Sequence, residues 1–143
     1  MNTAREAAVA HARSMLGVPW RHQGRQPWAV DCVGLVLLSL RAAGLDLSDE
    51  RQYGREPWND QLQEKLRSRF GNPVPESDWQ QGDIAVFRAP QREPCHIGLL
   101  ANYRYGGFTL IHARAEGRRC VVEHALDSRW RRLLVEVYSP WET

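Results

Sequence analysis

The sequence lacks the features that mark several common classes of protein. Its longest apolar run covers residues 33–38, which is far too short to cross a membrane, and residues 1–20 contain no apolar segment typical of a signal peptide. Lysine is almost absent: Lys65 is the single lysine, and the net charge of the chain is only +2. Because the arginines are scattered along the chain, we expect neither a nucleic-acid-binding tail nor a polybasic membrane patch.

Cysteine is also scarce. The three cysteines, an odd number without regular spacing, do not form the framework of a disulfide-stabilised secreted domain, so we expect synthesis in a reducing cytoplasm. A chain of 143 residues without repeats or linkers fits one domain, and its 43% hydrophobic and 25% charged residues are ordinary for a globular protein. We therefore expect a single domain over residues 1–143.

The N-terminal half of the chain carries the pattern of helices. Residues 3–16 predict a first helix, and residues 58–69 predict a shorter one. The stretch between residues 17 and 30 is rich in Gly and Pro and predicts a loop.

A third helix is expected to begin at Cys32. Apolar residues follow at the i, i+3, i+4 and i+7 spacing of a buried helix face, namely Val33, Val36, Leu37 and Leu40. Asp31 stands at the N-cap position of this helix, and Gly44 stands just after its end.

The C-terminal half alternates between apolar and polar residues. Five segments show this strand pattern: DIAVFRA, HIGLLANY, FTLIHAR, RCVVEHA and RLLVEVYS. The sequence YRYGG between the second and third segments predicts a hairpin turn. Helices followed by strands with short connections indicate an α+β fold, with N-terminal helices packed on a central antiparallel sheet of about five strands.

Three residues of these elements could carry chemistry. Cys32 would lie in the first turn of its helix, where unpaired N–H groups and the helix dipole favour a thiolate and could bind an oxyanion. His96 and His112 fall in strands on either side of the predicted turn, so they could lie side by side at about 5 Å. In that arrangement His96 is the base and His112 orients it.

The residues around this set receive simpler interpretations. Gly98, two residues after His96, predicts a close approach of backbone or substrate. Cys95 is expected to face away from His96, because successive strand side chains point to opposite faces. We expect Cys120 to lie in the core and His124 on the surface, since neither belongs to a motif.

Other interpretations of the same residues stay open at this point. A cysteine at a helix start often only fills a core, and a strand histidine is often structural. A zinc site is a further alternative, although the chain has no C-x-x-C or H-x-x-x-H spacing. Its ligands would come from Cys32, Cys95, His96, His112 and Cys120.

Four fragments in order, DCVGLV, WQQGDIAVF, CHIGLL and LIHA, resemble the NlpC family of papain-like peptidoglycan endopeptidases. The resemblance implies a papain-like NlpC fold with Cys32 as nucleophile, His96 as base and His112 as the orienting residue. It implies hydrolysis of a peptide bond in the peptidoglycan stem, typically between D-glutamate and diaminopimelate, through an acyl-enzyme. It implies neither a metal nor an organic cofactor.

The stretch WRHQGR…DCVGL is similar to the branch of this family encoded in tailed-phage and gene-transfer-agent tail modules. This implies a substrate-binding role for Trp20, which replaces the family's usual tyrosine, and for His22. It also suits Arg25 to a stem-peptide carboxylate. Asp31 is a further substrate-binding candidate, although the role of helix cap is favoured for it over that of catalytic acid. The implied location is a virion tail or tail-like particle, with the stem peptide as substrate and tail-tip proteins as partners.

Two further functions remain as alternatives. A structural tail-tip or tail-assembly protein could keep the peptidase fold with weak or no activity, an interpretation that Trp20 motivates. An amidase of the CHAP type also has a cysteine before a histidine. The histidine of LIHA favours the NlpC interpretation, because the CHAP type more often has an acidic or amide residue in third place.

Overall fold

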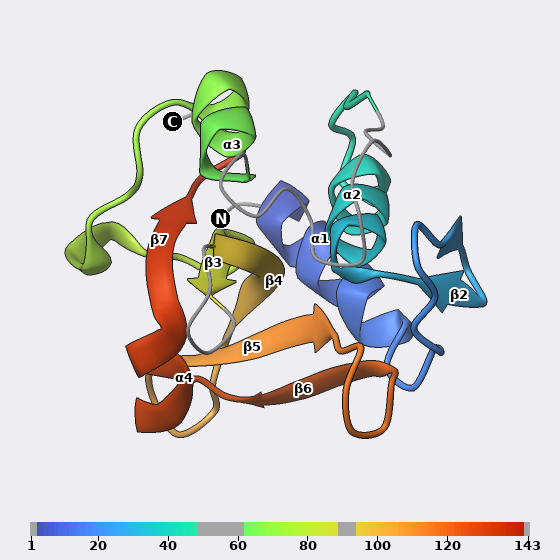
Figure 1. The fold of residues 1–143 in the computed structure, drawn as a ribbon. Helices are drawn as coiled ribbons and strands as arrows, with labels where there is room; N and C mark the ends of the chain where they lie inside the picture. Colours follow the sequence, from blue (N-terminus) through green and yellow to red (C-terminus); the bar gives the residue numbers. More distant parts are fainter. Residues whose placement is uncertain (1–2, 49–61, 89–93, 142–143) are drawn as a thin grey trace.

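The computed structural model describes residues 3–48, 62–88 and 94–141, and its centre is a five-stranded antiparallel sheet. The strands lie in the order β6-β5-β4-β3-β7, and α1 and α2 lie side by side against the sheet (Figure 1). Their bounds are β3 (Ile84–Arg88), β4 (Pro94–Asn102), β5 (Phe108–Ala113), β6 (Val121–Ala125) and β7 (Leu134–Tyr138). The predicted α+β fold with five antiparallel strands is therefore confirmed.

The helices are α1 (Thr3–Ser14), α2 (Cys32–Ala42), α3 (Leu62–Phe70) and α4 (Ser128–Leu133), with a 3-10 turn at Glu76–Asp78. Helix α1 ends two residues before its predicted end, and of the residues that follow it Met15 is buried whereas Leu16 is 46% exposed. Helix α3 was predicted from residue 58, but residues 58–61 lie outside the described residues. Helix α4 was not predicted: its last two residues, Arg132 and Leu133, occupy the start of the segment expected to form the last strand.

Helix α2 follows its sequence pattern closely. Its predicted apolar residues, Val33, Val36, Leu37 and Leu40, are all buried. Gly44 lies in the left-handed region with φ +100° just after the C-cap, where most other residues would be strained. The helix that carries Cys32 is thus anchored in the core along its length.

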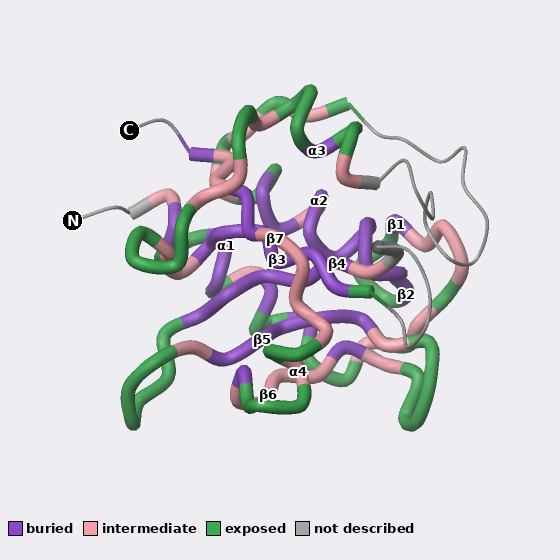
Figure 2. The backbone as a smooth tube through the Cα atoms, turned by 60° about the vertical axis from the view of Figure 1, so that its left-hand side comes forward, coloured by how far each residue is buried: buried purple, intermediate pink, exposed green. Residues whose placement is uncertain are grey.

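The sheet separates two apolar clusters. On β4, Ile97 and Leu99 belong to the larger cluster, which α1 and α2 complete, while Leu100 belongs to a smaller cluster that includes Phe87. Trp130 of α4 packs against this smaller cluster. Buried residues run through the central strands and these two helices, whereas the hairpin ends are exposed (Figure 2). The period-two alternation of each strand therefore distributes its side chains between two cores.

The segment between α1 and α2, predicted as a loop, is joined to the sheet by backbone hydrogen bonds. It contains the short hairpin β1 (Arg25–Gln26) and β2 (Ala29–Val30). The N–H of Trp20 donates to the carbonyl of Arg119 at 2.7 Å, and the N–H of Val30 donates to the carbonyl of Pro19 at 3.1 Å. The chain immediately before Cys32 is thereby fixed to the residues that lead into β6.

A buried ion pair fastens α1 to the turn that enters β3. Arg5 of α1 contacts Asp83 at 2.7 Å, and Gly82 before it has φ +86°, a conformation that glycine adopts readily in a turn. Burial raises the pKa of Asp83, while hydrogen bonds from the Gln80 N–H and from Arg5 oppose that shift.

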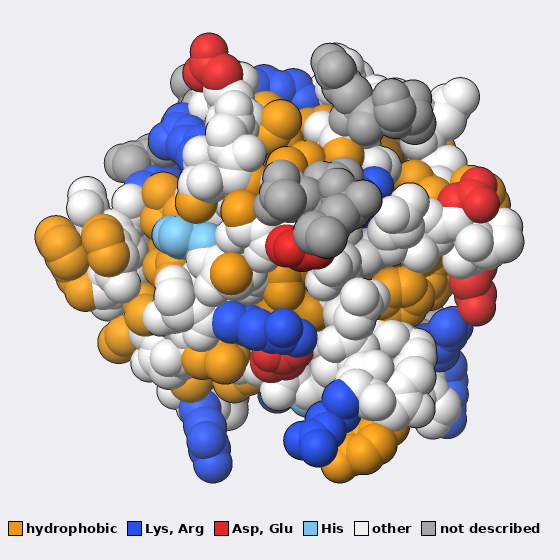
Figure 3. Space-filling model, turned by 180° about the vertical axis from the view of Figure 1, so that it is seen from behind, with side chains coloured by type: hydrophobic (Ala, Val, Ile, Leu, Met, Phe, Trp, Pro, Cys, Tyr) orange, Lys and Arg blue, Asp and Glu red, His pale blue; other side chains and the backbone are white. Residues whose placement is uncertain are grey.

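The outer surface mixes charged and apolar side chains. On the face drawn in Figure 3, arginines are spread among acidic and apolar residues without a single basic patch. Within residues 3–48, 62–88 and 94–141, no helix is long and apolar enough to cross a membrane.

Candidate active site

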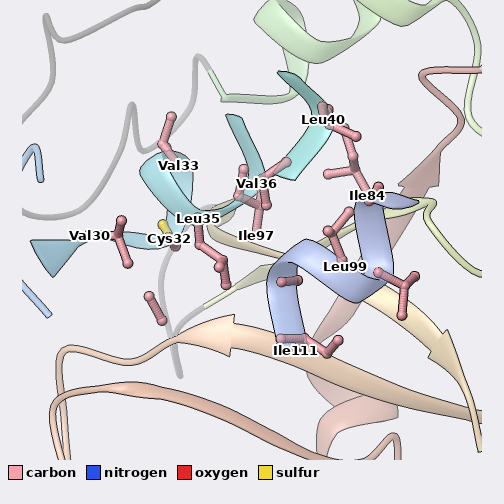
Figure 4. Close-up of a cluster of buried hydrophobic side chains, with 14 of the residues drawn as sticks. Val30, Cys32, Val33, Leu35, Val36, Leu40, Ile84, Ile97, Leu99 and Ile111 are labelled. Atoms are coloured by element: carbon pink, nitrogen blue, oxygen red, sulfur yellow. The ribbon is translucent and has the colours of Figure 1, made fainter. Parts of the chain in front are cut away.

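Cys32 is the first residue of α2 and is 4% exposed. Figure 4 shows its sulfur at the start of the helix, beside the apolar side chains of the larger core. The N–H groups of the first helical turn carry the positive end of the helix dipole, which stabilises a thiolate at this position. The local sequence therefore places the most nucleophilic side-chain type of the chain where its ionised form is favoured.

Asp31 caps the same helix, as predicted. Its Oδ1 accepts a hydrogen bond from the N–H of Gly34 at 2.7 Å, and its Oδ2 accepts one from the N–H of Gln23 at 2.9 Å. Arg25 lies 2.9 Å from Oδ1 of Asp31, and both side chains are only 4% exposed. Because Arg25 neutralises the carboxylate of Asp31, this carboxylate repels a thiolate on the neighbouring Cys32 only weakly.

This ion pair bears on the expected role of Arg25. The guanidinium was expected to meet a carboxylate of the substrate, but the structure buries it against a carboxylate of the protein itself. Arginine was expected to bind a carboxylate, and it does so here. The carboxylate is that of Asp31, six residues later, because the β1–β2 hairpin brings the two side chains together.

His96 and His112 form a direct hydrogen bond, as the strand pattern predicted. Nε2 of His96 and Nδ1 of His112 lie 2.7 Å apart, and the two ring centroids are 5.0 Å apart. His112 is fully buried on β5, and His96 is half-buried on β4. The bond holds the ring of His96 in one orientation.

The register of β4 and β5 explains how the two rings meet. Leu99 pairs with Ile111, so His112 lies beside Gly98 and not directly opposite His96. A Cβ at Gly98 would come within 2.9 Å of the Cβ of His112, closer than real contacts allow. The predicted side-by-side contact of the two histidines is therefore confirmed, with an offset of two residues in the strand pairing, and the glycine leaves the space for this diagonal contact.

Both histidines are held in their neutral form. Burial is the largest cause that lowers the pKa of His96 to about 4, and electrostatic repulsion by Arg114 and by the neighbouring ring of His124 adds to it. The pKa of His112 lies far below its ordinary range, first because of burial and then because of His96 and the same two neighbours. At neutral pH His96 can therefore accept a proton.

A third histidine, His124 of β6, continues the chain of hydrogen bonds. Its Nε2 lies 2.8 Å from Nε2 of His112, and its Nδ1 lies 2.9 Å from the carbonyl oxygen of Ala125. The expectation that His124 is a surface residue was wrong, since it is half-buried. The signal that could have found it is register: β6 places Val122 opposite His112, so His124 lies on the same face, two residues along.

Trp130 of the unpredicted helix α4 covers these rings. Its ring centroid lies 4.8 Å from that of His112, 5.2 Å from that of His124 and 6.4 Å from that of His96. The guanidinium of Arg114 lies over the same indole at 5.6 Å. This aromatic cover contributes to the burial that keeps the imidazoles neutral.

Trp20 and His22 lie in the segment that joins the sheet before α2. Trp20 is half-buried, packs against the larger core and carries the guanidinium of Arg119 over its ring at 5.6 Å. His22 is half-buried in the same segment. Their predicted contact with substrate stays a prediction.

The expectations for the other two cysteines have different outcomes. Cys120 is half-buried and not in the core, contrary to expectation. The side chain of Cys95 lies outside the described residues, so its predicted orientation has no test here. Among the described residues no three His, Cys, Asp or Glu side chains converge in a way that would hold a metal ion.

The fold brings the start of α2 and the histidines to the same end of the sheet. Helix α2 contacts both β4 and β5, the strands that carry His96 and His112, and Cys32 belongs to the larger apolar cluster. The hydrogen bonds from residues 18–20 to residues 119–121 tie the same end together. A thiol at a helix start and an oriented neutral imidazole are the two groups that nucleophilic acyl transfer requires.

Comparison with known proteins gives a family match over most of the chain. The model of the NlpC/P60 family matches residues 17–139 of the chain. No curated protein matches it significantly.

Several solved structures share the fold. NlpC1 from Trichomonas vaginalis has a TM-score of 0.69 at 21% identity, over 99% of this chain and 45% of NlpC1. The NlpC/p60 domain of the peptidoglycan hydrolase SagA has a TM-score of 0.62 at 20% identity, over 94% of this chain and 97% of that domain. An N-acetylmuramoyl-L-alanine amidase from Bacteroides uniformis has a TM-score of 0.56 at 12% identity, over 95% and 97%. The chain spans less than half the length of NlpC1, and at these identities the likeness concerns the fold.

Proposed function

The chain belongs to the NlpC/P60 family, and from this membership we propose that it is a cysteine endopeptidase that hydrolyses a peptide bond of the peptidoglycan stem. In this proposal Cys32 is the nucleophile, His96 is the base and His112 orients His96. The observation that carries the proposal is the 2.7 Å hydrogen bond between the two imidazoles. It leaves Nδ1 of His96 as the nitrogen that can serve the sulfur.

The proposed reaction has two halves. Nδ1 of His96 takes the proton of Cys32, and the sulfur forms a bond to the carbonyl carbon of the scissile amide. The N–H groups at the start of α2 stabilise the negative oxygen, and the imidazolium then protonates the departing amine as the C–N bond breaks. Water, deprotonated by His96, attacks the thioester and releases the acid product together with the free thiol.

We propose the bond between D-glutamate and diaminopimelate as the one cleaved, and a phage tail or tail-like particle as the site of action. The similarity of WRHQGR…DCVGL to tail-encoded members supports this proposal. Trp20 and His22 would then border the stem peptide, with Trp20 offering an indole N–H donor and a stacking surface. Tail-tip proteins would be its partners.

Two alternatives have specific support. The fold shared with an amidase from Bacteroides uniformis favours a second candidate bond, between muramic acid and alanine. Trp20, an indole under Arg119 in place of the family tyrosine, favours a tail-structural protein with weak activity.

Digestion of purified diaminopimelate-type sacculi separates these functions. The intact chain should release muropeptides whose masses place the cut between D-glutamate and diaminopimelate, and Cys32→Ala should abolish release. Cys120→Ala is the matched control, because it removes a half-buried thiol from outside the proposed catalytic set and should leave cleavage intact.

Each other outcome identifies a different function. Products cut at muramic acid would establish an amidase. Cleavage that survives in Cys32→Ala would overturn the assignment of the nucleophile. If the folded wild-type chain releases nothing, both alone and with tail proteins added, the structural role replaces the enzymatic one.

A further inference from the structure

Three imidazoles are joined one after another by hydrogen bonds, and the last one is hydrogen-bonded to a backbone carbonyl; we call this series the imidazole chain. The contacts run from Nε2 of His96 to Nδ1 of His112, from Nε2 of His112 to Nε2 of His124, and from Nδ1 of His124 to the oxygen of Ala125. Their lengths are 2.7, 2.8 and 2.9 Å, all within normal hydrogen-bond range. The imidazole chain therefore contains one histidine, His124, more than the proposed mechanism uses.

The contact between Nδ1 of His124 and the oxygen of Ala125 determines which nitrogen of each of the three imidazoles carries the hydrogen. A carbonyl oxygen only accepts, so Nδ1 of His124 must carry the hydrogen, and the Nε2 of the neutral ring is then an acceptor. His112 must donate to it from Nε2, which leaves Nδ1 of His112 as an acceptor for the Nε2–H of His96. When all three imidazoles are neutral, the free lone pair of His96 is therefore on Nδ1.

We propose that His124 is a positioning residue that fixes the tautomers of His112 and His96 and so keeps Nδ1 of His96 as the basic nitrogen. This inference rests on the proposed function for its effect on catalysis, but the proton positions are a property of the resting protein. Without His124, His112 is free to carry its hydrogen on Nδ1. His96 would then accept at Nε2, hold its own hydrogen on Nδ1 and fail as the base.

The surroundings support a role in proton placement beyond packing. His124 and His112 lie under the same indole of Trp130, which shields the contact between them from water. In such an environment each hydrogen bond strengthens its neighbours, and a misplaced proton leaves two acceptors or two donors facing each other. The β5–β6 register holds the two rings on one face.

Nuclear magnetic resonance of the intact chain with 15N-labelled histidine tests the proton positions directly. In the wild type we expect the hydrogen on Nε2 in His96 and His112 and on Nδ1 in His124. In His124→Phe, which keeps an aromatic ring beneath Trp130, His112 should become a mixture of tautomers. A wild-type His124 protonated on Nε2, or a His112 unchanged in the variant, would overturn the inference.

Two substitutions of opposite hydrogen-bonding character test the effect on activity. His124→Glu supplies only an acceptor to Nε2 of His112 and should restore most of the activity lost in His124→Phe. His124→Lys supplies only donors, imposes the reverse order and should abolish cleavage. The loss of one fixing hydrogen bond in His124→Phe should lower kcat roughly tenfold with KM little changed.

The two readouts separate the failure of this inference from the failure of the proposed function. If Glu and Lys affect cleavage equally in variants that unfold at similar temperatures, His124 is only a packing residue and the inference is wrong. If the tautomers are as expected but no form of the chain cleaves peptidoglycan, the proton placement stands and the proposed function fails.

Discussion

At the scale of single residues, the pair formed by Arg25 and Asp31 decides how the helix that carries Cys32 begins. The carboxylate of Asp31 accepts hydrogen bonds from two N–H groups and contacts a guanidinium, while being almost fully buried. A buried ion pair contributes little net stability, but removal of one partner leaves a costly buried charge. The geometry at Cys32 therefore depends on both members.

Replacement of Arg25 by Met tests this role against the substrate role expected from the sequence. The variant should lose about 3 kcal/mol of unfolding free energy, because Asp31 would remain buried without its cation. Urea denaturation measures this loss. Arg13→Met is the control: the Arg13 side chain is 44% exposed and pairs with Glu123, so its removal should cost below about 1 kcal/mol. An Arg25→Met variant of wild-type stability with a raised KM would instead identify Arg25 as a substrate ligand.

Residue patterns predicted part of the candidate site. The cap and apolar stripe identified the helix of Cys32, and strand alternation with a turn placed His96 beside His112, a contact that the structure confirms. His124 was missed because it belongs to no motif, and its role depends on the register of β5 and β6. Register depends on packing and turn geometry, which local patterns do not determine.

At the scale of elements, the short helix α4 has an influence beyond its length. Asp127 caps it by accepting a hydrogen bond from the N–H of Trp130, and the indole then lies over the imidazole chain. The sequence around it, SRWRRLLVEV, alternates well enough to suggest that the last strand begins earlier. The predicted last strand therefore began two residues too early, at Arg132, which belongs to α4. Tertiary packing, and not local propensity, sets the boundary between α4 and β7.

Removal of the indole should expose the histidines. In Trp130→Ala the pKa of His112 should rise towards its ordinary value, because burial is the largest cause of its depression. Loss of a half-buried indole should also cost about 2 kcal/mol of stability. Titration of the histidine resonances measures the shift, and Trp79→Ala, which removes an indole in contact with Phe108, is the control. An unchanged His112 pKa would show that the indole does not control its burial.

At the scale of the whole molecule, the buried histidines make stability depend on pH. The pKa values of His11, His96 and His112 are all lowered in the folded protein, chiefly by burial. Below about pH 6.5 these histidines bind protons in the unfolded protein but remain unprotonated in the folded protein. Stability must then fall as the pH falls through this range.

Thermal unfolding between about pH 7 and about pH 5 tests this dependence, since this range lies above the ordinary carboxylate pKa values. The unfolding free energy should decrease with falling pH by at most about 1.4 kcal/mol per unit for each buried histidine. His112→Asn should reduce the slope, because it removes the most deeply buried of the three rings. Equal slopes for the variant and the wild type would contradict the assignment.

The space at Gly98 has a consequence for how such chains vary in length. His96 and His112 meet diagonally across a glycine, while residues 103–107 close the hairpin outside this contact. Insertions or deletions within the hairpin turn leave the strand pairing intact, so the number of residues between the two histidines is free to drift over generations. One residue inserted within β5 would instead turn His112 to the opposite face. In a genome, distant relatives are therefore better sought by a glycine two places after the first histidine than by any fixed distance to the second.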